Sequence, residues 1–460
     1  MATQLVSVLG LGFGDCGKGL FVDALCRDLD AHTVVRFNGG AQAAHNVVLP
    51  DGRHHTFSQF GAGTFQHGVV TLLAYPVIVH PTALLVENEY LRRAGVTNGL
   101  QRLIIDGRCR VTTPFHQAAG RMRELARADG RHGSCGVGVG ETVRQDLEQP
   151  ALTLRYADLP QRDSALAKLE AIRRHLLSAF DPICAASANR IEYQRERAVL
   201  ADPLMAAQWL ERAMELVLGV PPATHAEVAA RLHLSGTVVF EGAQGVLLDE
   251  WRGFHPHTTW SRIHTSSAEA VAADAGQLAR IRHLGALRSY QTRHGDGPLP
   301  THDTGLDALP ELHNASSGWQ GAFRRGHPDA LLMRYALSVA GRLDGLLISH
   351  LDAFERATDL AWCRAYEAPV VQGDEQLCRR DAAGRIVELR ASVGHDLDHQ
   401  ARLTGLLISA KPVMDGNPIA DAMQFVALVE ALAGLPVLLG SFGPTFENIR
   451  KLGATDEASY

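Results

Sequence analysis

The residues with the clearest chemical potential lie close to the N-terminus, in the glycine-rich segment Gly10–Gly19. Residues 12–18 fit the pattern G-x-x-x-x-G-K, in which backbone N–H groups surround a phosphate and the lysine reaches its oxygens. The hydroxyl residue that usually follows the lysine and holds magnesium is replaced by Gly19. A carboxylate such as Asp15 is tolerable among phosphates if a cation lies between them or if it acts as a base. The pattern therefore predicts a phosphate-binding loop in which Asp15 does chemistry. The alternative is a glycine-rich turn without a ligand.

Two other segments place polar side chains directly after a predicted strand. Val34–Phe37 is typical of a strand and leads into a loop of small residues that contains His45. Thr237–Phe240 is typical of another strand and leads into a turn that contains Gln244. In α/β proteins the loops at the carboxyl ends of strands carry the chemistry. The sequence therefore indicates His45 and Gln244 as candidate catalytic residues.

Together these segments resemble the adenylosuccinate synthetase family. The first loop is similar to the family's G-D-E-G-K-G, with Cys16 in place of the glutamate, and residues 36–46 are similar to R-F-x-G-G-N-N-A-G-H-T. The loop 132–140 aligns with G-T-T-G-R-G-I-G-P, and residues 240–249 match F-E-G-A-Q-G-x-L-L-D. Residues 290–301 resemble Y-T-T-R-V-G-x-G-P-F-P-T. The matches occur in the family's order from Gly10 to about Ile449.

The resemblance implies a GTP-dependent ligase of purine biosynthesis that forms carbon–nitrogen bonds. Such an enzyme phosphorylates the 6-oxo group of an IMP-like purine and then replaces the phosphate with the amine of L-aspartate. Asp15 would be the general base and His45 the general acid, while Lys18 would bind phosphate and Gln244 would hold the 6-oxo group. The resemblance also implies Mg²⁺ bound at Asp15 and Ala44, and a homodimer.

The same resemblance gives two larger sets of binding residues. The nucleotide-binding residues implied for GTP are Gly14, Cys16, Gly17, Lys18, Gly19, Asn46, Asp352, Ser441, Gly443 and Pro444. The residues implied for the other two substrates are Gln42, Ser134, Cys135, Thr259, Arg293, Ser316, Ser317, Arg324 and Arg325. Gly345–Asp352 is typical of an apolar strand that ends on an acid, and a carboxylate at that position would accept the two adjacent donors of guanine.

Several departures from the family pattern surround the two substrates rather than the catalytic residues. Cys135 replaces a hydroxyl residue, Gln149 stands where the family donates an arginine across the dimer, and Trp260 and Trp319 replace polar residues. Two alternatives therefore stay open. One is a paralogue of specialised nucleoside metabolism that activates another oxo-compound or uses another amine. The other is a non-catalytic nucleotide-binding protein, although such a protein would not need the base Asp15.

Composition favours a soluble intracellular protein, and the family resemblance implies a cytoplasmic enzyme with small-molecule partners. The chain has 460 residues, a formal charge of −6 and an apolar fraction of 46%, so it shows no basic excess of the kind that binds nucleic acid. No apolar run is long enough to span a membrane, and the N-terminus does not resemble a secretion signal. The seven cysteines form no C-x-x-C pair, so neither a zinc site nor a disulfide framework is indicated.

The expected fold is α/β, with a mostly parallel central sheet, a P-loop-like phosphate-binding loop and helical insertions. Residues 1–460 are expected to form a single adenylosuccinate-synthetase-like domain. The segment from about 165 to 230 is rich in Ala, Leu, Arg and Glu with a periodicity near 3.6 residues. This segment is predicted to be a helical insertion.

Overall fold

A computed structural model describes residues 3–127, 130–180, 190–311, 313–314, 319–356, 359–370 and 372–453. Its central feature is a ten-stranded sheet with the order β20-β19-β14-β11-β1-β10-β2-β5-β7-β9. Neighbouring strands are parallel except for the edge pair β19 and β20. The strands of this sheet are β1 (Thr3–Gly10), β2 (Ala31–Arg36), β5 (Val70–Leu73), β7 (Leu103–Asp106), β9 (Pro222–Ala223), β10 (Gly236–Glu241), β11 (Ile281–Arg288), β14 (Gly345–Ser349), β19 (Val437–Ser441) and β20 (Ile449–Lys451). The predicted α/β fold with a mostly parallel sheet is confirmed.

The remaining strands form small sheets at the periphery. They are β3 (His45–Val48), β4 (His54–Phe57), β6 (Ile78–Val79), β8 (Arg110–Val111), β12 (Gln291–His294), β13 (Phe323–Gly326), β15 (Cys363–Glu367), β16 (Cys378–Arg380), β17 (Ile386–Leu389) and β18 (Lys411–Met414). The antiparallel pair β12–β13 matters most for the site, because it brings Arg293 opposite Arg324.

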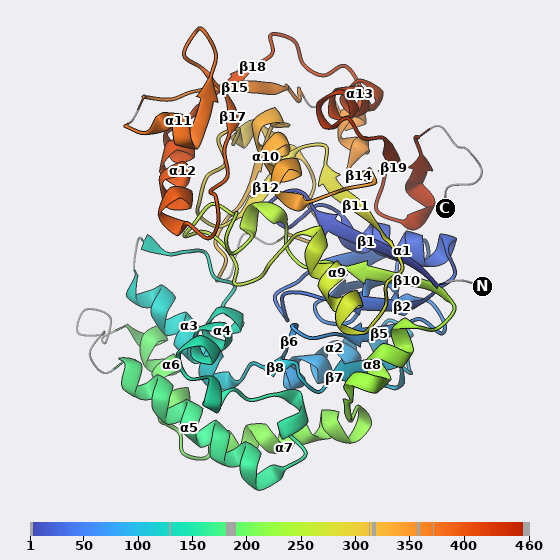
Figure 1. Ribbon diagram of the computed structural model, residues 1–460, viewed down its shortest axis with the longest axis vertical. Coiled ribbons are helices and arrows are strands. Elements are labelled where there is room, and N and C mark those ends of the chain that lie inside the picture. Colours follow the sequence, from blue (N-terminus) through green and yellow to red (C-terminus); the bar gives the residue numbers. More distant parts are fainter. Residues whose placement is uncertain are drawn as a thin grey trace.

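The helices of the described residues are α1 (Lys18–Asp28), α2 (Pro81–Arg93), α3 (Pro114–Ala126), α4 (Val139–Glu148), α5 (Arg162–Phe180), α6 (Ile191–Ala201), α7 (Met205–Gly219), α8 (His225–Leu232), α9 (Thr265–Asp274), α10 (Ala330–Ala340), α11 (Asp374–Leu377), α12 (Leu397–Ser409) and α13 (Ala422–Ala433). Helices α5 to α8 fall in the segment predicted to be helical. Figure 1 shows α5, α6 and α7 together at one end of the molecule, with α11, α12 and α13 at the other. Among the described residues, none of the helices is both long and apolar enough to cross a membrane.

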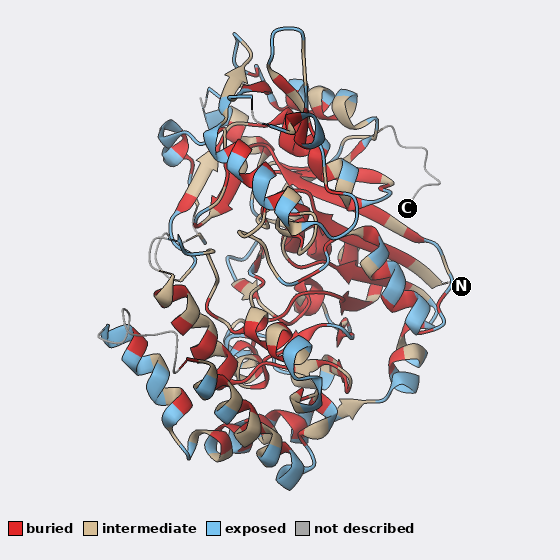
Figure 2. Cartoon of the chain, turned by 60° about the vertical axis from the view of Figure 1, so that its left-hand side comes forward, coloured by how far each residue is buried: buried red, intermediate tan, exposed pale blue. Residues whose placement is uncertain are grey.

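The two faces of the central sheet are covered by different helices. Because successive side chains of a strand point to opposite faces, Leu5 packs with α8 and α9, whereas its neighbour Val6 packs with α1. Both side chains are at most 2% exposed. The sheet is consequently buried on both sides, as Figure 2 shows, and its strands are nearly continuous apolar runs. The loops at the carboxyl ends of these strands carry the candidate site.

Candidate active site

The first glycine-rich loop connects β1 to the N-terminus of α1. Gly17 caps the helix with φ 76°, and a Cβ at this position would lie 2.6 Å from the Cβ of Ser349, so both conformation and space require glycine. Lys18 is the first residue of α1 and only 2% exposed, and its Nζ donates to the carbonyl of Gly14 at 2.5 Å. The first turn of α1 contains no acidic residue. This helix N-terminus is therefore suited to an anion.

Asp15 lies in this loop with its side chain 31% exposed. Its Oδ2 atom accepts hydrogen bonds from Arg288 Nη1 at 2.5 Å and from Asn314 Nδ2 at 2.8 Å. Burial raises the pKa of this carboxyl, but the positive charges of Arg288 and Lys18 and the hydrogen bond from Asn314 outweigh that effect and hold the pKa below its ordinary value. Asp15 is therefore an ionised carboxylate, and its Oδ1 atom has no hydrogen-bonding partner among the described residues.

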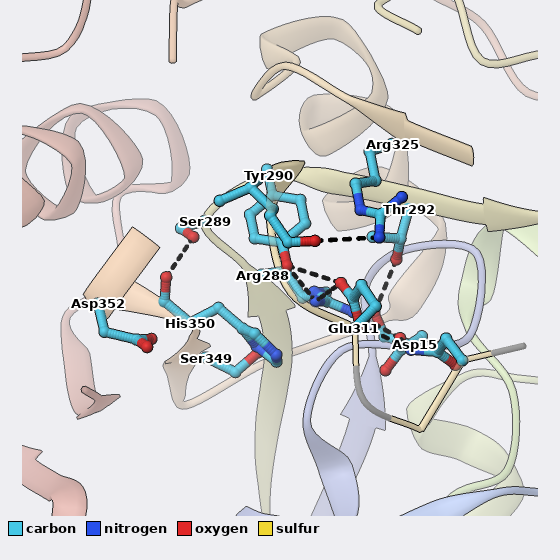
Figure 3. A network of polar contacts seen from close by, with 12 residues as sticks. Asp15, Arg288, Ser289, Tyr290, Thr292, Glu311, Arg325, Ser349, His350 and Asp352 are labelled. Atoms are coloured by element: carbon cyan, nitrogen blue, oxygen red, sulfur yellow. Dashed lines mark hydrogen bonds and ion pairs between the residues drawn. The ribbon is translucent and has the colours of Figure 1, made fainter. Parts of the chain in front are cut away.

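Arg288 joins two carboxylates, as Figure 3 shows. Its buried guanidinium contacts Asp15 on one side and Glu311 on the other, and it donates to the hydroxyl of Tyr290 at 2.6 Å. That hydroxyl in turn donates to Glu311 at 2.7 Å. Burial lowers the pKa of Arg288, but the two carboxylates raise it by more than burial lowers it. The guanidinium is therefore fully charged. A small cavity of about 20 Å³ lies beside Asp15 and Arg288, large enough for roughly one water molecule.

His45 begins β3 and is held by a buried carboxylate. Its Nδ1 atom lies 2.5 Å from Oε1 of Glu241, and Oε2 of the same carboxylate accepts from the N–H of Ala62 at 2.9 Å. Burial lowers the pKa of His45 to about 4, although Glu241 opposes this shift. Burial raises the pKa of Glu241, but nearby Arg36 and His45 lower it below its ordinary value. Glu241 therefore fixes the imidazole and leaves its Nε2 atom for a ligand.

Two glutamine side chains lie close to the same loops, and neither has a hydrogen-bond partner among the described residues. Gln244 has a left-handed backbone conformation with φ 58°, and both polar atoms of its amide are buried without a hydrogen bond. Gln42 is likewise buried at both polar atoms without a partner. Buried polar groups without partners are costly, and they are rare unless a ligand satisfies them. Each amide can donate and accept at once, as a purine edge requires.

The residues predicted to hold Mg²⁺ lie on the first loop and on the segment before β3. Ala44 is exposed and directly precedes His45. Asn46 follows, and its Oδ1 accepts from Thr56 Oγ1 at 2.7 Å. Mg²⁺ needs only one or two protein oxygens when substrate phosphates and water complete its shell. The free Oδ1 of Asp15 meets that requirement, so the donor set fits this ion.

The second glycine-rich loop precedes α4 and carries Ser134 and Cys135. The Oγ of Ser134 accepts from the N–H of Gly136 at 3.2 Å. Burial raises the pKa of the Cys135 thiol, which is therefore neutral. Thr259, predicted to contact the same substrate, lies outside this loop and donates its N–H to the carbonyl of Leu248 at 2.8 Å.

The three predicted arginines fall on the β12–β13 pair, on two different faces. Arg293 lies directly opposite Arg324, while Arg325 is the next residue along β13 and points to the other face. Arg325 forms an ion pair with Asp307 at 3.0 Å. Arg293 and Arg324 form no ion pair with the described residues and donate instead to backbone carbonyls, including that of Gly295. Burial and the charge of Arg324 lower the pKa of Arg293 to about 9. The β12–β13 pair therefore contains two neighbouring cations that form no ion pair among the described residues, although the charge of Asp296 acts on both.

Ser316 and Ser317, predicted to contact the amine donor, lie outside the described residues. Trp319, which follows them, packs against the second glycine-rich loop: a Cβ on Gly136 would lie 2.8 Å from its indole ring. The guanidinium of Arg121 lies 5.4 Å from the centre of the same ring. Trp319 thus fills space between the two substrate loops with an apolar face.

The residues predicted to read guanine lie at the ends of β14 and β19. The sequence predicted a strand that continues to Asp352, but β14 ends at Ser349 because His350 turns the chain with φ 62°. Asp352 instead lies in a short 3₁₀ helix, Leu351–Arg356, and its carboxylate is 2.5 Å from Arg356 Nη2. Ser441 ends β19 and donates to the carbonyl of Gly443, which Pro444 follows.

Four polar residues of this site were not predicted from the sequence. They are Glu241, Arg288, Glu311 and Asn314, and each contacts His45 or Asp15 directly or through one further residue. Glu241 could have been found, because it belongs to the same matched segment as Gln244. The other three carry no spacing signal, since Arg288 and Asn314 are 273 and 299 positions from Asp15 in the sequence.

Comparison with known proteins identifies the family of this chain. The sequence model of the adenylosuccinate synthetase family matches residues 7–450. The adenylosuccinate synthetase of Azotobacter vinelandii is 30% identical over 451 residues, which cover 95% of this chain and 96% of that protein. The enzyme of Pseudomonas aeruginosa is 31% identical over 446 residues, with the same coverage of both chains.

Two solved structures share the fold. The fully ligated adenylosuccinate synthetase of Plasmodium falciparum superposes with a TM-score of 0.74 at 18% identity, covering 98% of this chain and all of that one. The succinoaminodeoxyadenylate synthetase of cyanophage S-2L, solved with dGMP and with dATP as an energy donor, gives a TM-score of 0.59 at 14% identity and covers 98% and 96% of the two chains. On this evidence the chain belongs to the adenylosuccinate synthetase family, whose members are GTP-dependent ligases that form carbon–nitrogen bonds.

Proposed function

We propose that this protein joins an IMP-like purine to the amine of L-aspartate and converts GTP to GDP and phosphate in doing so. The observation that carries the proposal is that the loop of the ionised carboxylate Asp15 lies against the segments of His45 and Gln244. A Cβ on Gly19 would lie 2.9 Å from the Cβ of His45, and one on Gly14 would lie 3.9 Å from the Cα of Gln244. A protein that only bound nucleotides would not need the carboxylate beside the phosphate loop. The membership of the family supports the same reaction class.

The first step activates the purine. Asp15 accepts the N1 proton of the ring, and the negative charge that develops on the 6-oxygen is stabilised by Gln244 and His45. The 6-oxygen then attacks the γ-phosphorus of GTP, and GDP leaves. Lys18 and the amides at the start of α1 hold the phosphates. A bound Mg²⁺, held by Asp15 and Ala44, would neutralise phosphate charge.

The second step forms the new bond. The amine nitrogen attacks C6, and phosphate departs with the oxygen that it received in the first step. Arg293 and Arg324, which form no ion pair among the described residues, support an anionic amine donor, because a carboxylate would pair with both. Asp352 is proposed to accept from the guanine of GTP, and Asn46, Ser441, Gly443 and Pro444 to lie around the same nucleotide.

A second candidate is a related ligase that uses another oxo-substrate or another amine. The specific observation that favours it is the position of Trp319, whose indole fills the space beside the second substrate loop. The solved cyanophage protein of the same fold, which was bound to dGMP and dATP, supports this candidate.

Phosphate release distinguishes these proposals. The purified protein would be incubated with GTP, a purine and one amino acid, and both phosphate and the coupled product would be measured. Turnover with IMP and L-aspartate supports the first proposal. Turnover with another purine, such as dGMP, or with another amino acid supports the second. Absence of phosphate release with every combination would reject both. A cytoplasmic homodimer that acts as one domain over residues 1–460 is part of the same proposal, and analytical ultracentrifugation tests the dimer.

A further inference from the structure

A second and larger cavity lies away from Asp15. Its volume is about 280 Å³, and none of its lining residues lines the cavity beside Asp15 or belongs to the predicted site. It is formed by the N-terminus of α9, the C-terminal end of α10 with the following Gly341, and the loops that carry Arg252 and His395. The polar character of these residues indicates a ligand of defined charge.

The N-terminus of α9 provides two free backbone donors. The N–H of Ser267 donates to the carbonyl of His264 at 3.0 Å, whereas the N–H groups of Thr265 and Ser266 donate to none of the described residues. The helix has ten residues, begins at Thr265 and has no acidic residue in its first turn. The residue before it, His264, makes no capping hydrogen bond with its side chain. The first N–H groups of a helix have no partner within the helix, and the aligned peptide dipoles place partial positive charge there. This end of α9 is therefore suited to an anion.

A largely buried threonine whose hydroxyl has no hydrogen-bond partner among the described residues is the second, independent sign of a ligand. Thr265 is only 5% exposed and lines the cavity, yet its hydroxyl makes no hydrogen bond with the described residues. Gly341 lies against it: a Cβ at that position would come within 2.2 Å of the Thr265 oxygen. The absence of a side chain at Gly341 therefore leaves this hydroxyl open to the cavity.

The charged groups of the lining are positive on balance. Arg252 donates through one nitrogen to the carbonyl of Ser392 and forms no ion pair with the described residues. Arg262 is 59% exposed and forms an ion pair with Glu250. The lining contains one carboxylate, Asp249, and three backbone N–H groups donate to it. Burial lowers the pKa of His264, which is therefore neutral at pH 7.

We propose that this cavity binds a phosphate group, at a site separate from the ligase centre. The N–H groups of α9, the Thr265 hydroxyl and Arg252 supply hydrogen bonds to its oxygens, and Arg262 adds charge at the entrance. The phosphate group can come from inorganic phosphate or from a nucleotide. The site does not depend on the proposed ligase reaction, because binding requires no turnover.

Isothermal titration with inorganic phosphate tests the site, first in the wild type and then in a Lys18→Ala background that weakens phosphate binding at the first loop. Ser266→Asp should abolish phosphate binding at the cavity, because it places a carboxylate at the helix end. The same substitution favours the helix itself, so lost binding cannot be attributed to a weakened helix. Thr265→Val should weaken binding about 2–10-fold, the range for one neutral hydrogen bond.

Arg280→Gln is the matched control, because it removes one positive charge from an exposed arginine elsewhere. This variant should bind phosphate as the wild type does. A second titration with GMP distinguishes the two sources: tighter binding than inorganic phosphate, with the same dependence on Ser266→Asp, identifies a nucleotide site. Phosphate binding that survives both Ser266→Asp and Thr265→Val, or that disappears entirely in the Lys18→Ala background, would overturn the proposal. A missing ligase activity with intact binding would reject only the proposed reaction.

Discussion

At the scale of single residues, the candidate base Asp15 and the candidate acid His45 each contact a charged side chain. That side chain keeps Asp15 ionised and fixes the orientation of His45. Asp15 shares the guanidinium of Arg288 with Glu311, so it stays ionised although part of it is buried. The carboxylate of Glu241 orients the ring of His45. Burial alone would favour the neutral forms of the carboxylates, so these partners determine the chemistry that the site can perform.

Asp15→Asn should abolish turnover while GTP binding persists. The amide keeps the size of the side chain but cannot accept the purine proton, and loss of one general base costs on the order of 10²–10⁴ in rate. Steady-state kinetics and calorimetry with GTP measure the two effects separately. Asn314→Ala is a useful comparison, because it removes one neighbour of the carboxylate and keeps the carboxylate itself. A kcat close to that of the wild type for Asp15→Asn would remove this residue from the mechanism.

Glu241→Gln should lower kcat by about 10–100-fold with little change in substrate KM. The amide is isosteric, but it loses the carboxylate charge that holds Nδ1 of His45 and orients the ring, and partners of this kind typically contribute that much. The comparison variant is Asn38→Ala, which disturbs the same turn through the N–H of Ala243 without contacting His45. Equal losses in the two variants would indicate that Glu241 only supports the fold of the turn.

The nucleotide preference should depend on Asp352. Asp352→Ala should weaken GTP binding by roughly 1.5–3 kcal/mol, the contribution of a hydrogen bond to a charged group, and leave ATP binding unchanged. Arg356→Ala, which removes the ion-pair partner of this carboxylate, is the companion variant. Wild-type protein that binds ATP and GTP with equal affinity in calorimetry would contradict the assignment.

At the scale of elements, the strand pair β12–β13 decides which arginines can act together. Consecutive residues of a strand point to opposite faces, so Arg324 lies beside Arg293 across the pair, and Arg325 faces Asp307. Like charges directly across a strand pair are destabilising. An anionic substrate bound between Arg293 and Arg324 would therefore relieve the repulsion between the two cations and gain binding free energy.

Arg324→Ala should raise the KM for the amine about 10-fold or more without changing nucleotide affinity. The loss corresponds to one charged hydrogen bond of about 1.5–3 kcal/mol. Arg325→Ala should have a smaller effect, below about threefold, because its charge is already paired with Asp307. Amine titrations at saturating GTP measure both. If Arg324→Ala instead loses GTP binding, the amine site lies elsewhere.

At the scale of the whole molecule, buried neutral histidines make the fold sensitive to acid. Burial lowers the pKa of both His80 and His116 to about 4, from an ordinary value of 6.5. Below pH 6.5 the unfolded chain binds more protons at these positions than the folded chain does. The contribution of these two histidines to the free energy of unfolding is therefore full at neutral pH and is lost as the pH falls from about 6.5 toward 4.

Lowering the pH from 7 to 5 should reduce the free energy of unfolding by roughly 2 kcal/mol for each of these histidines. Urea unfolding at the two pH values measures the change, and His116→Gln should reduce it by about that amount. His225, an exposed histidine, is the control position. A pH dependence that is the same in His116→Gln and in the wild type would show that this residue does not contribute.

The sequence by itself determined the order of the glycine-rich loops, the strands that carry them and the identity of Asp15, Lys18, His45 and Gln244 as candidates. These are local properties: a tight turn needs glycine, a phosphate loop needs free N–H groups, and apolar runs of four to eight residues favour buried strands. The end of β14 could not be predicted from the sequence, because the left-handed conformation of His350 interrupts a run of residues that otherwise favours a strand.

Only the tertiary structure decided which charges face one another. Arg288 and Asp15 are 273 positions apart, and parallel strands β11 and β1 bring them together at the same edge of the sheet. The separation of Arg324 from Arg325 follows from the pairing of β12 with β13, and the cavity at α9 follows from the approach of Gly341 to Thr265. Such contacts depend on strand order and packing across the whole chain, and local sequence patterns do not encode them.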